Sequence, residues 1–148
     1  MDYKLLNKDD IPKVKPLIEA LGAYHNKIPQ KTPVKYPLVP VSEGIAFMIS
    51  CQENNTGKVM GLYDDDRIVG FAAIHFENGK GLLDYLFVYD EYRRNGYGGK
   101  LMNWALDEFK AADAEYAELK VVYGNNTKGL YEKFGFNTRC EIMALKLK

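Results

Sequence analysis

The segment "YRRNGYGGKLM", from Tyr92 to Met102, contains three glycines and three cationic side chains and leads into a sequence with helical spacing. Glycine allows a backbone to approach a ligand closely, and the N-terminus of a helix adds a partial positive charge. A loop of this kind is suited to hold an anion, most naturally a phosphate group.

Two common phosphate-binding loops do not fit the spacing. A Walker loop requires a glycine five residues before its Gly-Lys pair and a Ser or Thr after it, but Arg94 and Leu101 occupy those positions. A dinucleotide fingerprint requires a glycine three residues after Gly98, and that residue is also Leu101. The spacing that does fit is Arg/Gln-x-x-Gly-x-Gly, formed by Arg93, Gly96 and Gly98.

This pattern between a strand and a helix resembles the acetyl-CoA diphosphate loop of the GNAT superfamily of N-acetyltransferases. "LFVYDEYRRNGYGGKLM" is similar to the central motif of that family, and "LYEKFGF", at 130–136, is similar to its second motif. The order of expected elements also matches along nearly all of the chain, although the N-terminal third matches only in outline. The resemblance implies one N-acetyltransferase domain over residues 1–148, with acetyl-CoA as cofactor.

The resemblance also implies which residues bind the cofactor. Backbone groups of one strand segment would hold the pantetheine arm, and one N–H group there would polarise the thioester carbonyl. Backbone N–H groups and cationic side chains of the glycine-rich loop would hold the diphosphate. These cofactor-binding residues are Leu86, Phe87, Val88, Arg93, Arg94, Asn95, Gly96, Tyr97, Gly98, Gly99 and Lys100.

The second motif implies a general acid and a further contact with pantetheine. Tyr131 occupies the position of the family's tyrosine, which protonates the departing thiolate. The family usually carries an Asn seven residues before this tyrosine, but here that residue is Gly124. Asn125 and Asn126 follow it, and either is a candidate for the pantetheine contact.

Transfer to an amine also requires a base, because an alkylamine with a pKa near ~10.4 costs roughly 4 to 5 kcal/mol to deprotonate at pH 7. Asp84 is the predicted base, because it lies on an expected strand two residues before the cofactor-binding segment. Strand alternation places it on one face with Leu82 and Leu86.

Other residues remain open for the base and for the acceptor site. His75 and Glu77, on the preceding expected strand, are alternatives to Asp84, as is a water molecule with no dedicated base. Tyr24, His25 and Tyr36 are predicted to cap the acceptor pocket from the N-terminal side.

The fold expected from the hydrophobic pattern is α/β (α+β). It has a mixed, mostly antiparallel sheet flanked by helices, with a parallel, splayed strand pair at the cofactor site. Strands are expected at 3–6, 58–63, 67–76, 82–88, 117–123 and 142–148, and helices at 9–21, 42–52, 98–112 and 128–134. Four prolines between 27 and 41 predict a long loop. The 9–21 helix is expected to begin at the acidic pair Asp9 and Asp10, and the 42–52 helix at a Ser42 cap.

The composition argues against several classes of binding partner. Twenty acidic and twenty basic residues balance, and the pI is near 6.7, so no basic face for nucleic acid is expected. No apolar run is long enough to span a bilayer, and a cytoplasmic location is expected. Cys51 and Cys140 have no neighbours at metal-ligand spacing, so no metal site is predicted.

These observations favour an enzyme that passes acetyl from acetyl-CoA to a primary amine, most simply a small molecule, by direct attack in a ternary complex. A non-catalytic acyl-CoA-binding or regulatory domain and a protein or peptide N-acetyltransferase are the alternatives. The resemblance is equally compatible with a monomer and a homodimer, and the 142–148 strand is the expected pairing edge.

Overall fold

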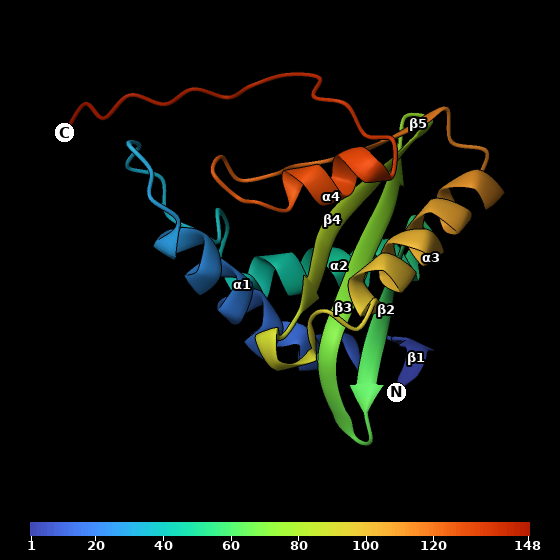
Figure 1. Ribbon diagram of the computed structural model, residues 1–148. Helices are drawn as coiled ribbons and strands as arrows, with labels where there is room; N and C mark the ends of the chain where they lie inside the picture. The colour runs from blue at the N-terminus through green and yellow to red at the C-terminus, as the bar shows by residue number, and fades with distance from the viewer.

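The computed structural model describes residues 1–148 and contains one twisted sheet with helices on both faces (Figure 1). Its strands are β1 (Asp2–Leu5), β2 (Gly57–Asp64), β3 (Arg67–Glu77), β4 (Lys80–Val88) and β5 (Tyr116–Leu119), in spatial order β1-β2-β3-β4-β5. All neighbours are antiparallel except β4 and β5. The expected mixed, mostly antiparallel sheet is therefore confirmed.

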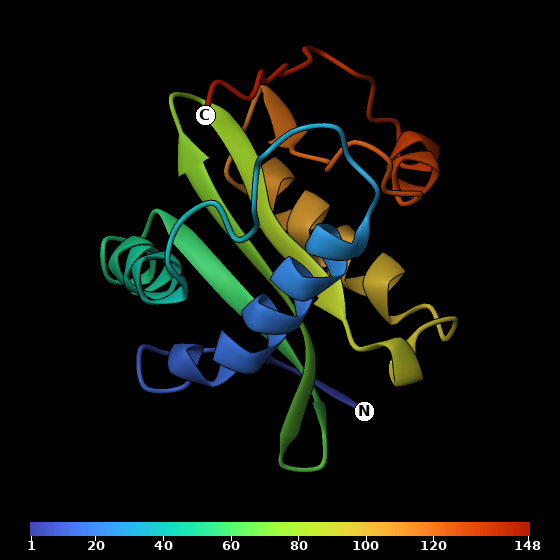
Figure 2. The ribbon, with the colours of Figure 1, turned by 90° about the vertical axis from the view of Figure 1, so that its left-hand side faces the viewer.

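The helices form two layers. The 3₁₀ turn η1 (Ile11–Val14) and the helices α1 (Lys15–Lys27) and α2 (Val41–Glu53) cover one face. The turn η2 (Asp90–Tyr92), α3 (Tyr97–Ala111) and α4 (Lys128–Lys133) follow β4 in the chain, and α3 covers the opposite face (Figure 2). The connection from β4 through α3 to β5 is the helical crossover that a parallel pair requires.

The middle strand β3 supplies both cores. Phe71 and Ala73 are buried in the cluster beneath α1 and α2, whereas Ala72 and Ile74 are buried in the cluster beneath α3. Strand alternation accounts for this division, and a sheet covered on both faces accounts for the continuous apolar run from Ile68 to Ile74.

The N-terminal ends of the first two helices differ from the prediction. The chain enters α1 through η1, and the side chain of Asn7 accepts hydrogen bonds from the N–H groups of Asp9 and Asp10 at 3.0 Å each. The helix α2 begins at Val41, one residue before Ser42, and no side chain caps it. Local turns at Asn7 and Pro40 thus set these boundaries.

The strand β5 is shorter than the expected 117–123. Its parallel pairing with β4 ends at Leu83 and Leu119, after which the two strands diverge. A strand without a neighbour has no ladder to continue. The backbone of β4 from Asp84 to Val88 therefore lies on an open sheet edge, as the expected splayed pair requires.

The predicted strand at 142–148 is wrong, because no regular structure follows α4. An ion pair between Arg139 and Glu118, with 3.0 Å between Nε and Oε1, holds the start of this segment beside β5. The remainder runs away from the sheet edge, and its large apolar side chains are 81 to 93% exposed. Its alternating pattern indicates a preference for extended backbone, but a strand also needs a neighbouring strand to pair with. No helix has the length and apolar character needed to cross a membrane.

Candidate active site

The glycine-rich loop connects β4 to α3 and is braced from both sides. The Tyr92 hydroxyl donates to the Asp64 carboxylate at 2.6 Å, and the Asn95 amide donates to the carbonyls of Tyr92 and Arg93 at 3.1 Å each. Arg94 and Gly96 have left-handed backbones, with φ of 65° and 79°. A bulky residue rarely adopts this conformation, so Arg94 marks the tight turn of the loop.

The loop presents a row of free backbone donors. Lys100 N–H donates to the Gly96 carbonyl, which is the first helical bond of α3, and no N–H group from Arg94 to Gly99 has an acceptor within the protein. A Cβ atom added at Gly98 or Gly99 would meet no other atom within 4 Å. Free N–H groups with open space before them at a helix N-terminus form an anion site.

The side chain of Arg93 makes several contacts within the protein. Its Nε donates to the Val88 carbonyl at 2.9 Å, and its Nη1 lies 2.8 Å from the Asp90 carboxylate. The guanidinium also lies over the rings of Tyr24 and Phe87 at 5.3 and 5.5 Å. Arg93 therefore ties the loop to α1 and β4, while Arg94 and Lys100 are exposed and have no ion-pair partner.

The open edge of β4 has a defined pattern of free groups. Tyr89 N–H donates to the Val69 carbonyl at 3.0 Å, so antiparallel alternation turns the Phe87 backbone toward β3 and those of Leu86 and Val88 away from it. The Val88 carbonyl accepts the hydrogen bond from Arg93 Nε. The free donors on this edge are thus the N–H groups of Leu86 and Val88.

A β-bulge determines where Asp84 points. Ala73 pairs with Tyr85 and Ile74 with Leu83, which leaves Asp84 unpaired between them. Asp84 therefore contacts His75, on the sheet face covered by α2, whereas Leu86 packs in the cluster on the α3 face. The expectation that Asp84 and Leu86 share a face was wrong, because the extra residue of a bulge reverses the alternation.

Asp84 is held beside the imidazole of His75. Its Oδ2 lies 2.5 Å from Nδ1 of His75, and its side chain is 26% exposed. Burial raises the pKa of the Asp84 carboxyl, and the hydrogen bond with His75 offsets part of that increase. No sequence motif predicted this contact, because the two residues meet only through the β3–β4 pairing.

Tyr131 lies on α4 among apolar side chains of the α3-face cluster, with its ring 6.5 Å from that of Phe136. Burial raises the pKa of the Tyr131 phenol, which therefore stays protonated at neutral pH. The position of α4 over the diverging ends of β4 and β5 places this helix beside the open edge (Figure 1).

The turn before α4 separates the two asparagines. The Asn125 side-chain oxygen accepts from Thr127 N–H at 3.0 Å and so stabilises the turn, whereas Asn126 is exposed. Gly124 has φ of 88°, and a Cβ there would lie 2.9 Å from the Ile28 side chain. A left-handed backbone packed against the N-terminal loop accounts for glycine at this position.

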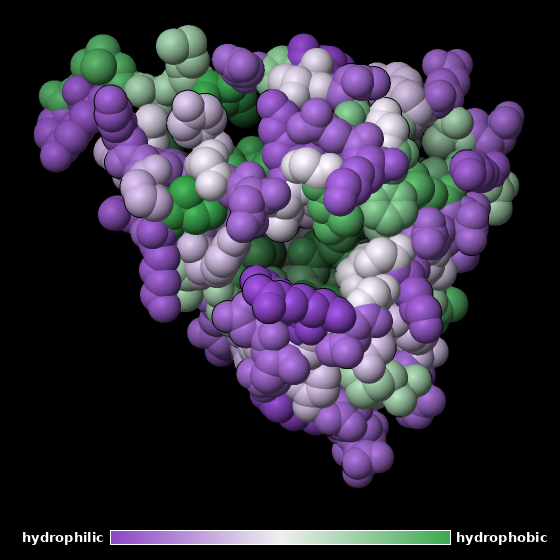
Figure 3. Space-filling view, viewed as in Figure 1, coloured by the Kyte–Doolittle hydropathy of each residue, from purple (hydrophilic) through white to green (hydrophobic).

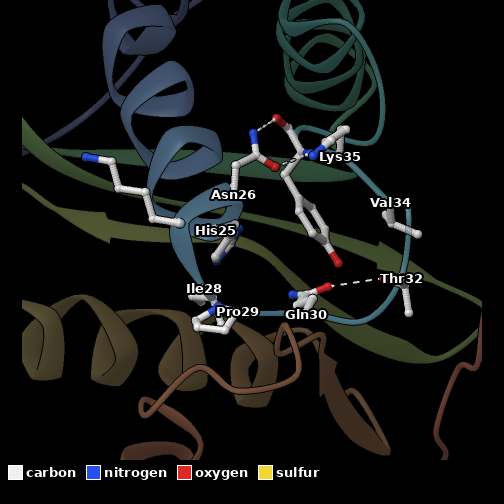
Figure 4. Close-up of a pocket in the computed structure, with 10 residues that line it drawn as sticks. His25, Asn26, Ile28, Pro29, Gln30, Thr32, Val34 and Lys35 are labelled. Atoms are coloured by element: carbon white, nitrogen blue, oxygen red, sulfur yellow. Dashed lines mark hydrogen bonds between the residues drawn. The ribbon is translucent and has the colours of Figure 1, made fainter.

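The segment after α1 forms a pocket of about 220 Å³ (Figure 4). Asn26 holds its outer wall, because its amide donates to the Tyr36 carbonyl and accepts from Tyr36 N–H at 2.8 Å each. The ring of His25 contacts those of Tyr24 and Tyr36, with ring centroids 5.9 Å and 5.4 Å away, respectively. These three residues are the ones predicted to cap the acceptor pocket, and the Asn26 clamp had no recognisable sequence signal.

The same loop reaches the C-terminal half of the chain. The Gln30 amide donates to the Tyr123 carbonyl at 3.4 Å, and Ile28 packs against Gly124. Figure 3 shows a hollow with an apolar floor between hydrophilic borders on this face of the molecule. The open edge of β4 is thus bordered by the N-terminal loop, α4 and the glycine-rich loop.

The family of the chain follows from comparison with known proteins. The model of the Acetyltransferase (GNAT) family matches residues 25–136. The chain belongs to the GNAT acetyltransferase family. Acetyl-CoA is the cofactor of this family, in agreement with the expectation from the glycine-rich loop. A search of curated proteins gave no match.

Solved structures support the same fold for this GNAT protein. A predicted acetyltransferase from Clostridium acetobutylicum, solved with acetyl-CoA, aligns with TM-score 0.77 at 17% identity over 98% of this chain and 95% of that one. The PaiA N-acetyltransferase of Thermoplasma acidophilum, solved with coenzyme A, gives 0.72 at 18% identity over 94% and 92%. A ribosomal-protein-alanine N-acetyltransferase from Brucella melitensis gives 0.66 at 16% over 99% and 100%.

Proposed function

We propose that this GNAT protein transfers acetyl from acetyl-CoA to a primary amine, most simply a small molecule, by direct attack in a ternary complex. The whole chain would act as one acetyltransferase domain. The observation that carries the proposal is the order of groups along the open edge of β4: free loop donors at its C-terminal end, then free strand donors, then the Asp84 carboxylate at the bulge.

The free donors fit the parts of acetyl-CoA. The N–H groups from Arg94 to Gly99 bind the diphosphate, with Arg94 and Lys100 supplying charge. The N–H groups of Leu86 and Val88 bind the pantetheine arm as an added strand would. Phe87 and Arg93 support these segments through packing and hydrogen bonding, and Asn125 stabilises the turn beside the site. When bound, acetyl-CoA supplies an acetyl group activated as a thioester.

Asp84 accepts the proton of the amine. A carboxyl with a raised pKa is a stronger base than an ordinary aspartate, and general bases work best when their pKa lies near the working pH. Its bulge position turns the carboxylate to the face opposite Leu86. The amine is therefore expected to approach from the side of α1 and α2.

Tyr131 is the proton donor of the reaction. A tyrosine phenol is protonated at neutral pH, as a general acid must be, and burial raises the pKa of Tyr131 further. Direct transfer is supported by the places of the cysteines. Burial raises the pKa of the Cys51 thiol, which disfavours a thiolate there, and Cys140 lies on the exposed C-terminal segment.

A small acceptor is supported by the border of the site. The loop from Ile28 to Gln30 contacts the turn at Tyr123 and Gly124, so it crosses the approach to the open edge. A single amine-bearing molecule fits such an approach more readily than a folded protein surface does.

Tyr131→Phe is expected to lower kcat by about 10²-fold, because the general acid is lost while the aromatic packing remains. Steady-state kinetics with acetyl-CoA and one good acceptor would measure this, and KM for acetyl-CoA is expected to stay within about twofold. Wild-type kcat in the variant would remove Tyr131 from the chemistry. Tyr116→Phe, on an exposed tyrosine of β5, is the matched control.

The proposed function is tested by thermal unfolding with and without acetyl-CoA, followed by a thiol-release assay with polyamines, amino acids, aminoglycosides and short peptides. A rise in Tm with acetyl-CoA and thiol release with one soluble amine are the expected results. A rise in Tm without release from any amine would favour a non-catalytic acyl-CoA-binding domain. Release only with peptides would favour a protein or peptide N-acetyltransferase.

A further inference from the structure

His75 lies between two carboxylates. Its Nδ1 is 2.5 Å from Asp84 Oδ2, and its Nε2 is 3.2 Å from Glu77 Oε2. Along this row the exposed fraction of the side chain is 26% at Asp84, 11% at His75 and 54% at Glu77. The imidazole thus connects a partly buried carboxylate at the proposed reaction site with a carboxylate in contact with solvent.

Other groups around the row define its charge. Lys120, after β5, lowers the pKa of Asp84, and Glu77 raises it, although both effects are smaller than that of burial. From α2, the Phe47 ring stands edge-on to the imidazole at 5.1 Å, and Cys51 is the titratable group of that helix near Asp84. The Tyr85 hydroxyl lies beside Gly44 of α2. Besides His75, Lys120 is the cation that acts on Asp84, while Lys80 lies opposite Glu77 in the β3–β4 register and pairs with Glu118 of β5.

The geometry favours the uptake of one proton between Asp84 and His75. Ionised carboxylates only accept hydrogen bonds, so each ring nitrogen of His75 meets an acceptor. A neutral imidazole has a proton on one nitrogen and a lone pair on the other. With Nε2–H donating to Glu77, the Nδ1 lone pair faces the Asp84 carboxylate, and a proton taken up between Nδ1 and Oδ2 removes the resulting repulsion.

We propose that Asp84, His75 and Glu77 form a proton relay in which His75 positions Asp84 and carries the proton of the acceptor amine from Asp84 to Glu77 and solvent. This inference rests on the proposed function for the source of the proton. The relay itself is a property of three side chains joined through the β3–β4 pairing.

The proton balance is simple. The acceptor ammonium loses one proton to the Asp84 carboxylate, which leaves a neutral amine with a free electron pair. The proton passes between Oδ2 and Nδ1, and the Nε2–H proton of the resulting imidazolium moves to Glu77 and then to water. One proton enters at Asp84 and one leaves at Glu77, and no electron is transferred. The imidazole, left with its proton on Nδ1, returns to the Nε2–H form by proton exchange with water before the next turnover.

The first test compares the pH dependence of kcat/KM for the acceptor in two variants. His75→Asn is expected to move the acidic limb to higher pH, because it removes a hydrogen bond and a charge that lower the pKa of Asp84. Glu77→Gln is expected to move the limb to lower pH, because it removes a charge that raises that pKa. A residue with only a packing role would not give opposite shifts.

Comparison of kcat with KM for acetyl-CoA distinguishes an effect on proton transfer from an effect on cofactor binding. His75→Asn is expected to lower kcat on the order of 10²-fold, with KM for acetyl-CoA unchanged. High concentrations of imidazole buffer should restore part of kcat in a His75→Ala variant and leave the wild type unchanged. The control Asp107→Asn removes an exposed carboxylate from α3, on the other face of the sheet, and should change neither kcat nor the limb.

The second test needs no turnover, so it also decides the inference if the proposed function fails. The chain has two histidines, and His25→Gln assigns the ¹⁵N imidazole signals of His75. Asp84→Asn is expected to shift the Nδ1 signal most, and Glu77→Gln the Nε2 signal. The proposal is wrong if neither Asp84→Asn nor Glu77→Gln shifts the His75 nitrogen signals. It is also wrong if His75→Asn and Glu77→Gln move the acidic limb of the pH profile in the same direction. Absence of wild-type turnover with the expected nitrogen shifts would contradict the proposed function alone.

Discussion

Asp84→Asn is expected to lower kcat by about 10² to 10⁴-fold at neutral pH, because an amide cannot accept the proton of the acceptor amine. The amide is similar in size and can still contact Nδ1 of His75, so the loop and the β4 edge should be unaffected. KM for acetyl-CoA is therefore expected to remain near the wild-type value. Steady-state kinetics across pH 5 to 10 would measure both constants.

The stability of the Asp84→Asn variant supplies a second measurement. Burial raises the pKa of Asp84 above its ordinary value of 3.8, so the folded chain binds more protons than the unfolded chain just above that value. The free energy of unfolding of the wild type therefore contains a contribution that is lost as pH rises through the folded pKa. The asparagine variant has no such contribution. Urea unfolding from pH 4 to 8 should show a shallower decline for the variant.

Two outcomes would contradict the role of Asp84. Wild-type kcat in the variant would show that water or another group takes the proton. An equal fall in kcat and acetyl-CoA affinity would indicate a distorted site. Asp107→Asn is the control for loss of one carboxylate at an exposed position.

Gly98→Glu is expected to weaken acetyl-CoA binding while it stabilises the protein without ligand. Gly98 lies in the first turn of α3, has no left-handed backbone, and has no atom within 4 Å of an added Cβ. Replacing glycine in a helix and placing an acid at its N-terminus together contribute about 1 kcal/mol. A carboxylate facing the diphosphate costs several kcal/mol, so Kd should rise by about 10²-fold or more.

Gly98→Lys separates charge from volume at this position. It fills the same space with a long side chain but adds a cation, so its effect on Kd should be clearly smaller than that of Gly98→Glu. Isothermal titration with acetyl-CoA would measure Kd, and thermal unfolding without ligand would report stability. Unchanged Kd in folded Gly98→Glu would mean that the diphosphate binds elsewhere.

The elements around the site were largely predictable from local pattern. The β2–β3–β4 meander, the helix after the glycine-rich loop and the short helix around Tyr131 follow from alternation, helical spacing and glycine positions. The positions at which strands stop pairing were not predictable in the same way. The C-terminal segment, with its exposed Ile142 and Leu145, has the pattern of a strand, yet it pairs with no strand of the sheet.

The contacts of a motif side chain depend on the tertiary structure as well as on the motif. Arg93 stands at the first position of the family pattern, but its side chain folds back to the Val88 carbonyl and the Tyr24 ring. A pattern of residue types does not encode the rotamer of a long side chain. The direction depends on which carbonyls and aromatic rings other segments bring close, and α1 supplies one of them.

By itself, the sequence determined the glycine-rich loop, the strand that enters it and the helix that leaves it. It also determined the presence of Tyr131 at a motif position and of Asp84 on the strand just before the cofactor-binding segment. These features depend on local backbone preference and periodicity, which neighbouring residues set. Only the tertiary structure decided that Asp84 faces His75, that the β4 edge is open, and that the N-terminal loop borders it. Those features depend on a bulge in strand pairing and on contacts between distant segments, which no local pattern specifies.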